Sequence, residues 1–219
     1  MKFYIVTLFP EIFPPVLNSS ILKRAQARKL ISFSFINPRD FTSDNYHTVD
    51  DKPYGGGPGM VMKVEPIVKS LESIPGKPYK ILLSASGQTF TQQKAKRLKA
   101  KSEIVLICGH YEGVDARVED FVDEIISIGD FVLTGGEIAA LAIVDSLTRL
   151  LPGAINIKSP QKESFSKKTL EHEQYTRPEV FRHLKVPKVL LAGNHKEIEN
   201  WREKQSVKRT KKFHADLLK

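Results

Sequence analysis

Three glycine-rich stretches follow or frame short apolar runs that are typical of β-strands. They are "LLSASG" (82–87), "LICGHYEG" (106–113) and "SIGDFVLTGGE" (127–137). Glycine lets the backbone approach a ligand closely, and open α/β sheets bind ligands beyond the carboxyl ends of their strands. One such stretch would indicate only a turn or a helix end, but three at equivalent strand ends predict a pocket.

The composition of these stretches indicates the kind of ligand. They contain neither G-x-G-x-x-G nor the Lys-Ser or Lys-Thr pair of a P-loop. The expected walls are apolar and formed by main chain, with one exposed carboxylate, Glu112, and no lysine to hold phosphates. Such walls suit a planar base with a cationic or zwitterionic tail better than a triphosphate. We therefore predict a nucleoside-like cofactor held by main-chain groups.

The charge of the chain is unevenly distributed. Residues 1–155 carry 18 Lys/Arg against 17 Asp/Glu, whereas residues 156–219 carry 16 against 8. The basic segment also contains aromatic residues, among them Tyr175, Trp201 and Phe213. Excess cations interleaved with aromatic side chains favour a polyanion partner over an ordinary solvated surface. We predict that this partner is a nucleic acid, and composition alone does not distinguish RNA from DNA.

The remaining composition limits the class of protein. A chain of 219 residues, 41% hydrophobic, can bury one core and carry a smaller second domain. The single cysteine, Cys108, is typical of a buried strand and cannot form a disulfide within the chain. The first apolar run is broken by Pro10 and Glu11, so it predicts a strand rather than a signal peptide. No run is long enough to span a membrane, and we expect a cytoplasmic protein.

Short β-rich runs alternate with helical patterns along most of the chain. We predict strands at 2–9, 31–37, 79–84, 103–108, 124–128 and 131–134. We predict helices at 19–30, 64–73, 91–100, 114–121 and 137–151, the first with a serine N-cap and the third with Thr91. This alternation is typical of an α/β domain with a largely parallel sheet. Beyond about 154 the pattern dissolves, and it becomes helical again at 178–184 and at 194–209, where Asn194 and Glu197 resemble a capping box.

Several longer motifs, in their order along the chain, resemble one bacterial family. They are "PRDFTSDNYHTVDDKPYGGGPGMVM", "CGHYEGVDARV", "SIGDFVLTGGE", "DSLTRLLPG", "YTRPEV" and "LLAGNHKEIENWREKQSVKRT". The set resembles the tRNA (guanine-N1)-methyltransferases that modify position 37, beside the anticodon. The resemblance runs from the first strand to about Thr210. It implies a SPOUT-class, S-adenosylmethionine-dependent enzyme with a deep trefoil knot, which ordinary chain topology would not predict.

The resemblance also implies how the chain is organised. It assigns residues 1–155 to a knotted, S-adenosylmethionine-binding catalytic domain, 156–176 to a mobile linker that carries the catalytic acid, and 177–219 to a basic helical tRNA-binding domain. The predicted helix 137–151 is apolar on nearly every face, which is typical of a buried helix. A second subunit would cover it, in agreement with the family's homodimer, where the linker and C-terminal domain of one chain complete the other chain's pocket.

Cofactor contacts follow from the same resemblance. They fall on Leu83, Ser84, Gly109, Tyr111, Glu112, Gly113, Ile128, Gly129, Asp130, Phe131, Val132, Leu133, Gly135 and Gly136. Two positions depart from the usual family sequence. Ala85 stands where proline is usual, so that loop lacks a fixed φ, and Phe131 stands where tyrosine is frequent.

Methylation at guanine N1 needs a base and a cation. N1 carries a proton at neutral pH, and negative charge develops on O6 as the proton leaves, so a carboxylate and a cation would serve the two atoms. The resemblance assigns these roles to Glu163 in "KESF" and Arg149 in "DSLTRLLPG", acting in trans in the homodimer. The family more often has aspartate at the base position. Glutamate is one methylene longer and loses more rotamer freedom.

Substrate contacts are also carried over by motif. The segment "PYGGGPGM" alone could form an anion nest, but the resemblance makes it the entrance and base site, with Asp50, Tyr54 and Gly59 as candidates. Candidate tRNA contacts are Asn194, His195, Trp201, Arg202, Lys208 and Arg209. Magnesium is associated with the family, but Glu112, Glu163 and Glu171 are too few and too scattered to predict a site. The six histidines show no zinc spacing.

Two other classes of protein remain open at this stage. A non-catalytic RNA-binding protein would explain the basic segment but not the three glycine-rich strand ends. A doubly wound nucleotide-phosphate enzyme would explain the glycines but lacks the phosphate-binding lysine and the Ser/Thr that holds Mg²⁺.

Overall fold

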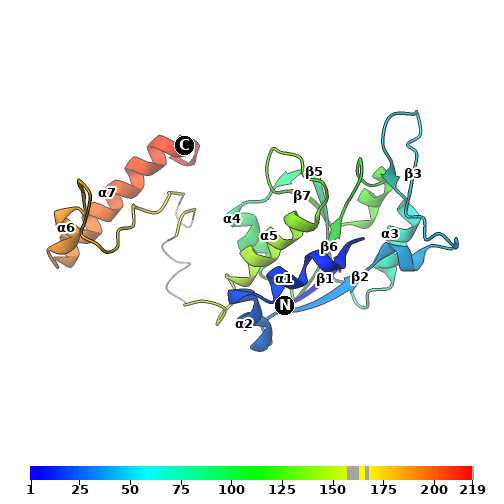
Figure 1. The fold of residues 1–219 in the computed structure, drawn as a ribbon, viewed down its shortest axis with the longest axis horizontal. Helices are drawn as coiled ribbons and strands as arrows, with labels where there is room; N and C mark the ends of the chain where they lie inside the picture. The colour runs from blue at the N-terminus through cyan, green and yellow to red at the C-terminus, as the bar shows by residue number, and fades with distance from the viewer. Residues whose placement is uncertain (157–162, 166–167, 219) are drawn as a thin grey trace. The chain divides into compact units, whose positions relative to one another are not determined.

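The computed structural model describes residues 1–156, 163–165 and 168–218 of the chain. The chain divides into two compact units, Met1–Asn156 and Ile157–Lys219 (Figure 1). This division falls next to the boundary predicted at 155. Among the described residues, no helix combines the length and apolarity that a membrane span requires.

A five-stranded sheet forms the centre of the first unit. Its strands lie in the order β2 (Ser32–Ile36), β1 (Lys2–Val6), β6 (Glu103–Cys108), β5 (Tyr79–Thr89) and β7 (Glu124–Ser127). Every neighbouring pair is parallel, so the carboxyl ends of the strands meet at one edge. The predicted α/β class with a mainly parallel sheet is confirmed, whereas the trefoil knot stays a prediction.

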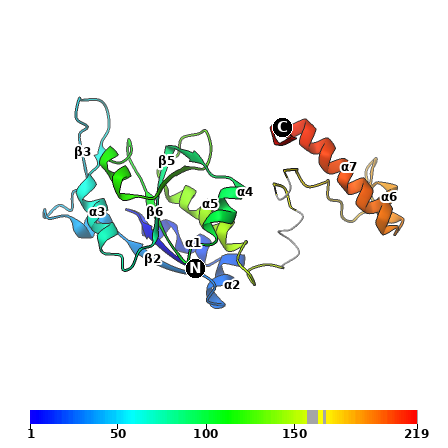
Figure 2. The same cartoon turned by 180° about the vertical axis from the view of Figure 1, so that it is seen from behind.

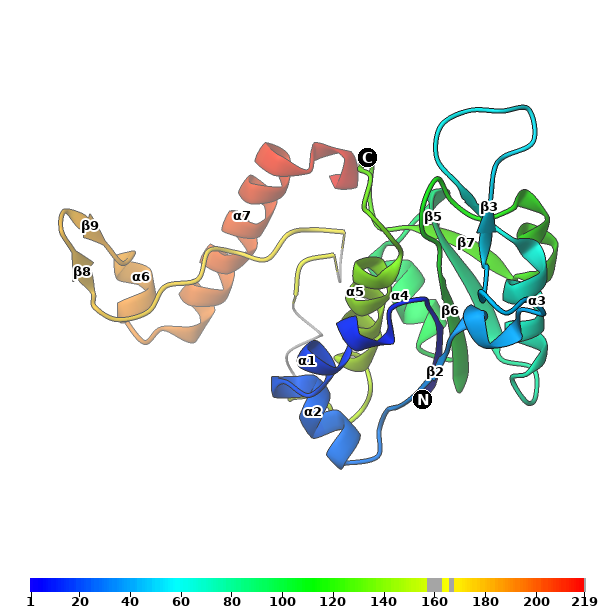
Figure 3. The ribbon, with the colours of Figure 1, turned by 45° about the vertical axis from the view of Figure 1, so that its right-hand side comes forward.

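Alternate side chains of the strands build a core on each face of the sheet. On β6, Ile104 and Leu106 join one core, whereas Val105 and Ile107 join the other. The first face is covered by α1 (Pro14–Leu17), α2 (Ser20–Ala27), α4 (Gln92–Leu98) and α5 (Glu137–Thr148). The second face is covered by α3 (Val64–Glu72) and the 3-10 turn η3 (Ala116–Phe121). Figure 2 and Figure 3 show α4 and α5 on one side of the sheet and α3 on the other.

Helix starts follow the sequence signals in two of three cases. Thr91 caps α4 by accepting a hydrogen bond from Lys94 N (3.2 Å), and Asn194 Oδ1 accepts one from Lys196 N (3.2 Å) at the start of α7 (His195–Phe213). Both bonds satisfy donors that the first turn leaves without helical partners. Ser19 precedes α2 without capping it, because its hydroxyl donates to Pro15 O (2.6 Å) instead.

The strand predicted at 131–134 is wrong. The chain turns directly after β7, where Ser127 Oγ donates to Gly129 O (2.9 Å) and Gly129 N donates back to Ser127 Oγ (3.2 Å). Residues 128–136 then form a loop, in which Phe131 is 54% exposed and Val132 is 88% exposed. β-branched and aromatic residues favour strands only where a neighbouring strand can pair with them. This loop instead leaves the sheet at its edge strand.

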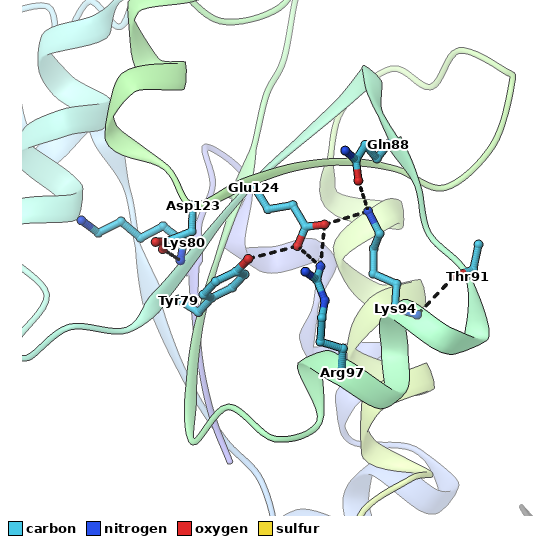
Figure 4. Close-up of polar contacts among 8 residues, drawn as sticks. All are labelled: Tyr79, Lys80, Gln88, Thr91, Lys94, Arg97, Asp123 and Glu124. Atoms are coloured by element: carbon cyan, nitrogen blue, oxygen red, sulfur yellow. Dashed lines mark hydrogen bonds and ion pairs between the residues drawn. The ribbon is translucent and has the colours of Figure 1, made fainter.

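A cluster of charged side chains fixes α4 to the edge strand β7 (Figure 4). The Glu124 carboxylate lies 2.7 Å from Lys94 Nζ and 2.6 Å from Arg97 Nη2, and Tyr79 donates its hydroxyl to it (3.3 Å). Burial raises the pKa of Glu124, but the hydrogen bonds and charges of Lys94 and Arg97 lower it further, so the net shift is downward. Lys94 Nζ also donates to Gln88 Oε1 (3.1 Å), which ties the end of β5 to this cluster.

The second unit is built around the long helix α7. It also contains the hairpin of β8 (Val180–Phe181) and β9 (Leu184–Lys185), the short helix α6 (Lys188–Leu191) and the 3-10 turn η4 (Ala215–Leu218). The helix predicted at 178–184 is therefore wrong. Arg182 has a φ of +56°, a left-handed conformation that reverses the chain between the two short strands and that a helix interior does not contain.

The predicted linker, 156–176, is structured over its last residues. Leu170 N donates to Thr210 Oγ1 (2.9 Å), and Ser206 Oγ donates to Leu170 O (2.6 Å). Arg209 Nη1 lies 3.6 Å from a Glu173 carboxylate oxygen. Residues 168–176 therefore pack along α7, whereas 157–162 and 166–167 of the predicted linker lie outside the described residues.

Candidate cofactor and catalytic site

A cavity of about 320 Å³ lies at the carboxyl ends of β5, β6 and β7. Its lining residues come from 82–86, 109–119 and 126–139. These are the three glycine-rich stretches together with their flanks, and all the predicted cofactor residues except Asp130 line the cavity. The volume falls in the range of roughly 300–1,000 Å³ that is usual for small-molecule sites.

The first wall is an interruption in the pairing of β5 with β7. Leu83 and Gln88 both stand opposite Ile126, so residues 84–87 loop out of the ladder. In this loop the hydroxyls of Ser84 and Ser86 are 2.9 Å apart, and Ser86 N donates to Ser84 Oγ (3.3 Å). These bonds constrain the loop that lacks a proline at its second position.

The second wall is the loop 109–113, which is clamped to the neighbouring strand β4 (Val61–Met62). Glu112 N donates to Met60 O (3.0 Å), and Met62 N donates to Gly113 O (3.0 Å). Tyr111 has a φ of +59°, a conformation that non-glycine residues seldom adopt and that persists only where surrounding contacts impose it. The main chain of this wall is therefore held in one form before any ligand binds.

Two glycines let the third wall pack against the end of β6. A Cβ on Gly136 would lie 2.7 Å from Cys108 Cα, and one on Gly135 would run into the His110 ring and the Glu137 carboxylate. Gly136 N donates to Gly109 O (2.9 Å). These glycines therefore permit close packing behind the cavity, whereas the exposed part of the loop, around Phe131, faces outward.

The predicted entrance residues lie on one hairpin but differ in position. Asp50 is in β3 (Asp50–Asp51) and pairs with Met62 of β4. Gly59 lies against the cavity, since a Cβ there would run into the Glu112 side chain. Tyr54 is fully exposed on the connection between the two strands. Of the three, Gly59 is therefore the one in direct contact with a cavity residue.

The two predicted catalytic residues lie outside the cavity. Arg149 is the C-cap of α5, and the cavity lies at the other end of that helix, beside Gly136. A helix of 12 residues is about 18 Å long. Glu163 lies in the second unit. The described residues of one chain thus form the cavity without either side chain.

The predicted tRNA residues of the second unit serve partly to build that unit. Asn194 caps α7. The Trp201 ring lies 6.3 Å from the His172 ring and 6.2 Å from the Tyr175 ring, so it helps to hold the segment before β8 on the helix.

The cations among the predicted tRNA residues differ in their surroundings. Arg209 approaches Glu173 and stacks over Phe213 at 5.7 Å. Arg202 lies 3.8 Å from Glu199. Lys208 and the N-terminal His195 of the helix are exposed, which leaves Lys208 the most accessible of these three cations.

Titratable groups at the cavity include acids but no reactive thiol. Burial raises the pKa of the Cys108 thiol well above its usual value, so the thiol stays neutral behind the cavity. A side-chain hydrogen bond from Arg117 lowers the pKa of Asp115, which caps η3. Within the described ranges, no group of three His, Cys, Asp or Glu residues is arranged to hold a metal ion.

Several lining residues were not predicted. They include Ser86, His110, Glu119 and Thr134. His110 and Thr134 lie inside motifs that had been recognised, so their inclusion required only that the whole stretch be assigned to the wall. Ser86 and Glu119 required the looped end of β5 and the turn η3, which no local pattern indicates.

The whole chain, residues 1–219, matches the family described as tRNA (Guanine-1)-methyltransferase TrmD. A tRNA (guanine-N(1)-)-methyltransferase of Carboxydothermus hydrogenoformans is 55% identical over all of this chain and 88% of that protein. Proteins of the same name from Desulfitobacterium hafniense and Nostoc punctiforme are each 50% identical over all of this chain, covering 84% and 93% of their own lengths. The chain belongs to the tRNA (guanine-N1)-methyltransferase family.

Membership of the tRNA (guanine-N1)-methyltransferase family confirms the resemblance drawn from the motifs. It also confirms the class of protein, an enzyme that methylates tRNA. The two other classes, a non-catalytic RNA-binding protein and a nucleotide-phosphate enzyme, are thereby set aside.

Proposed function

We propose that this chain transfers a methyl group from S-adenosylmethionine to N1 of the guanine at position 37 of tRNA, next to the anticodon. Methylation there would support maintenance of the reading frame. The observation that carries the proposal is the cavity at the carboxyl ends of β5, β6 and β7. It is lined by main chain and apolar side chains, with carboxylates at Glu112 and Glu119.

The lining residues fit this methyl donor. S-adenosylmethionine supplies a methyl group on a sulfonium and carries a planar adenine and an amino-acid tail. Apolar residues such as Ile128 and Leu133 suit the adenine, and the carboxylates of Glu112 and Glu119 suit the cationic groups. Among the described residues, the lining contains no lysine or arginine, which a triphosphate would require.

Glu163 and Arg149 would carry the chemistry at the guanine. The Glu163 carboxylate takes the N1 proton, and the Arg149 guanidinium stabilises the negative charge that develops on O6. No step passes through Mg²⁺, because the described residues offer no cluster of ligands for it. These roles rest on the family motifs that contain the two residues.

The exposed face of α5 supports a homodimer that brings Arg149 to the cavity. Ile138, Ala142 and Asp145 are exposed along one stripe of this otherwise buried helix, and Ile138 is 54% exposed. A two-fold contact along the stripe would pair the α5 helices of two chains in antiparallel directions. Arg149 of the partner subunit would then lie beside the start of this chain's α5, where the cavity is.

The basic second unit would hold the tRNA. Lys208 is exposed on α7, and Arg202 and Arg209 lie on the same helix. Cations of this kind contact phosphates without reading sequence. His195 and Trp201 complete the proposed tRNA surface, whereas the hairpin of Asp50, Tyr54 and Gly59 would shape the site of the target base. We place the enzyme in the cytoplasm, where a buried, unpaired Cys108 also fits.

Primer extension tests the proposed reaction. N1-methylation blocks the Watson–Crick edge of guanine, so extension on a treated tRNA transcript should stop next to position 37. A transcript with adenine at that position serves as the control. Full read-through on the guanine transcript with enzyme and S-adenosylmethionine present would refute the proposal. Thermal shift with S-adenosylhomocysteine, but not with ATP, should independently show donor binding.

A further inference from the structure

A buried carboxylate lies directly behind the cavity, and the proposed chemistry does not use it. Glu137 is the first residue of α5 and is only 3% exposed. Burial of an ionised carboxylate is costly unless it is paired or hydrogen-bonded. Its place at the start of a 12-residue helix lowers that cost, because the helix dipole favours negative charge there.

One oxygen of this carboxylate is bonded to the end of β1. Thr7 Oγ1 donates to Glu137 Oε1 (2.8 Å), and the same hydroxyl accepts a hydrogen bond from Phe9 N (3.0 Å). Thr7 directly follows β1 and is 1% exposed. The pair therefore joins the end of β1 to the start of α5, across a sequence separation of 130 residues.

The other oxygen faces a residue of the cavity wall. His110 Nδ1 lies 3.7 Å from Glu137 Oε2 and, among the described groups, is a buried nitrogen without a hydrogen-bond partner. His110 lines the cavity, and its ring contacts those of Phe9 (4.8 Å) and Tyr111 (5.5 Å). A buried polar atom of this kind needs a partner. The Glu137 carboxylate is the acceptor beside it.

Gly135 completes the arrangement. His110 and Gly135 form an antiparallel bridge, and any side chain at Gly135 would run into both the His110 ring and the Glu137 carboxylate. Three segments thus meet at one carboxylate: the end of β1, the end of β6 and the turn into α5. The last two of these provide the second and third walls of the cavity.

We propose that Glu137 is a positioning residue for the cofactor cavity. Its carboxylate accepts the Thr7 hydroxyl and the His110 Nδ1–H, and so holds His110 and the 135–136 turn in the form that binds the donor. Glu137 does not touch the donor itself. This inference rests on the proposed use of S-adenosylmethionine.

Calorimetric titration of the full-length protein with S-adenosylhomocysteine tests the proposal. Glu137→Met keeps the length of the side chain but removes both acceptors, and it should raise the Kd by about tenfold or more. Glu137→Gln keeps an acceptor for Thr7 and should raise the Kd less. Thr7→Val, which leaves the carboxylate in place, should raise it by about threefold. In steady-state kinetics the KM for S-adenosylmethionine should rise while kcat at saturation changes less than about twofold.

Thr148→Val is the matched control. Thr148 is also fully buried, and its hydroxyl donates to Val144 O (2.7 Å) near the far end of α5. This variant should lower the Tm without changing the Kd. If the Glu137 and Thr7 variants lose Tm but bind S-adenosylhomocysteine as tightly as the wild type, the carboxylate is merely structural and the inference fails. Wild-type protein that does not bind this ligand would refute the proposed function itself.

Discussion

The first unit is organised around buried side chains, whereas the second exposes most of its own. The buried hydrophobic residues run from Phe3 to Ala154, on both faces of the five-stranded sheet. Among the described residues of α7, Thr210 is the buried one. The charges differ as well, since residues 1–155 are almost balanced and 156–219 carry twice as many basic as acidic residues.

This difference indicates two ways of building a functional surface. The cavity of the first unit depends on main chain held by packing, as in the clamped loop 109–113 and the turn at Gly136. The surface of the second unit depends on the number and exposure of cations, which tolerate small shifts of the backbone. Substitutions in the two units should therefore fail in different ways.

The largest effect should come from the proposed base in the second unit. Glu163→Gln keeps the shape of the side chain but cannot accept the N1 proton, so we expect kcat to fall by about 10²- to 10⁴-fold. The Kd of S-adenosylhomocysteine should change by no more than a few fold, because the cavity lies in the first unit. Single-turnover assays and calorimetry measure the two quantities. Glu163→Asp, which restores the commoner family residue, should stay active. Normal turnover by the Gln variant would place the base elsewhere.

A mixed dimer should test whether the first unit needs its partner. Glu112→Lys places a cation in the cavity and Arg149→Ala removes the proposed O6 partner, so each homodimer should be inactive. If Arg149 acts in trans, one of the two sites in a purified mixed dimer is intact, and activity should return to about half of the wild-type rate. A mixed dimer as inactive as its parents would indicate that Arg149 serves its own chain.

Stability of the first unit should depend on the Glu124 cluster. Glu124→Gln should lower the free energy of unfolding by about 2 kcal/mol, less than for a fully buried pair because Arg97 is half exposed. The folded-state pKa of Glu124 is lowered, so its stabilisation is present above the unfolded pKa of about 4.3 and is lost as pH falls through the lower folded value. Urea unfolding between pH 7 and pH 3 measures both.

The matched control for this substitution is Glu65→Gln on α3. Glu65 forms an exposed ion pair with Lys69 (2.7 Å), and exposed pairs contribute little. Its loss should leave the unfolding midpoint at pH 7 unchanged. Equal effects of the two substitutions would show that burial of Glu124 adds nothing.

The smallest effect should come from one cation of the second unit. Lys208→Ala should weaken tRNA binding modestly and flatten the slope of log affinity against log salt by about 0.7–0.9, because one phosphate contact is lost. Filter binding over a salt series measures the slope, and Lys23→Ala, an exposed lysine of α2, is the control. The same slope in both variants would argue against a phosphate contact at Lys208.

Much of the fold could be predicted because local patterns and long-range contacts agree. The parallel strands and the Thr91 and Asn194 caps were predicted, since an apolar run or a capping side chain acts over a few residues. The strand at 131–134 and the helix at 178–184 were wrong for a shared reason. Each segment has the composition of a regular element, but a turn at Gly129 or at Arg182 prevents that element from forming.

The sequence by itself determined the α/β class, the three glycine-rich walls, the basic second unit and the family, because each is carried by residue types or by the order of motifs. Only the tertiary structure decided which residues meet. It placed Ser86 and Glu119 in the cavity, and it brought Thr7 and His110 to the Glu137 carboxylate. Contacts between residues so far apart in the chain depend on strand order and on the paths of loops. Neither leaves a local signal, because the chain pairs its segments only when the whole core is formed.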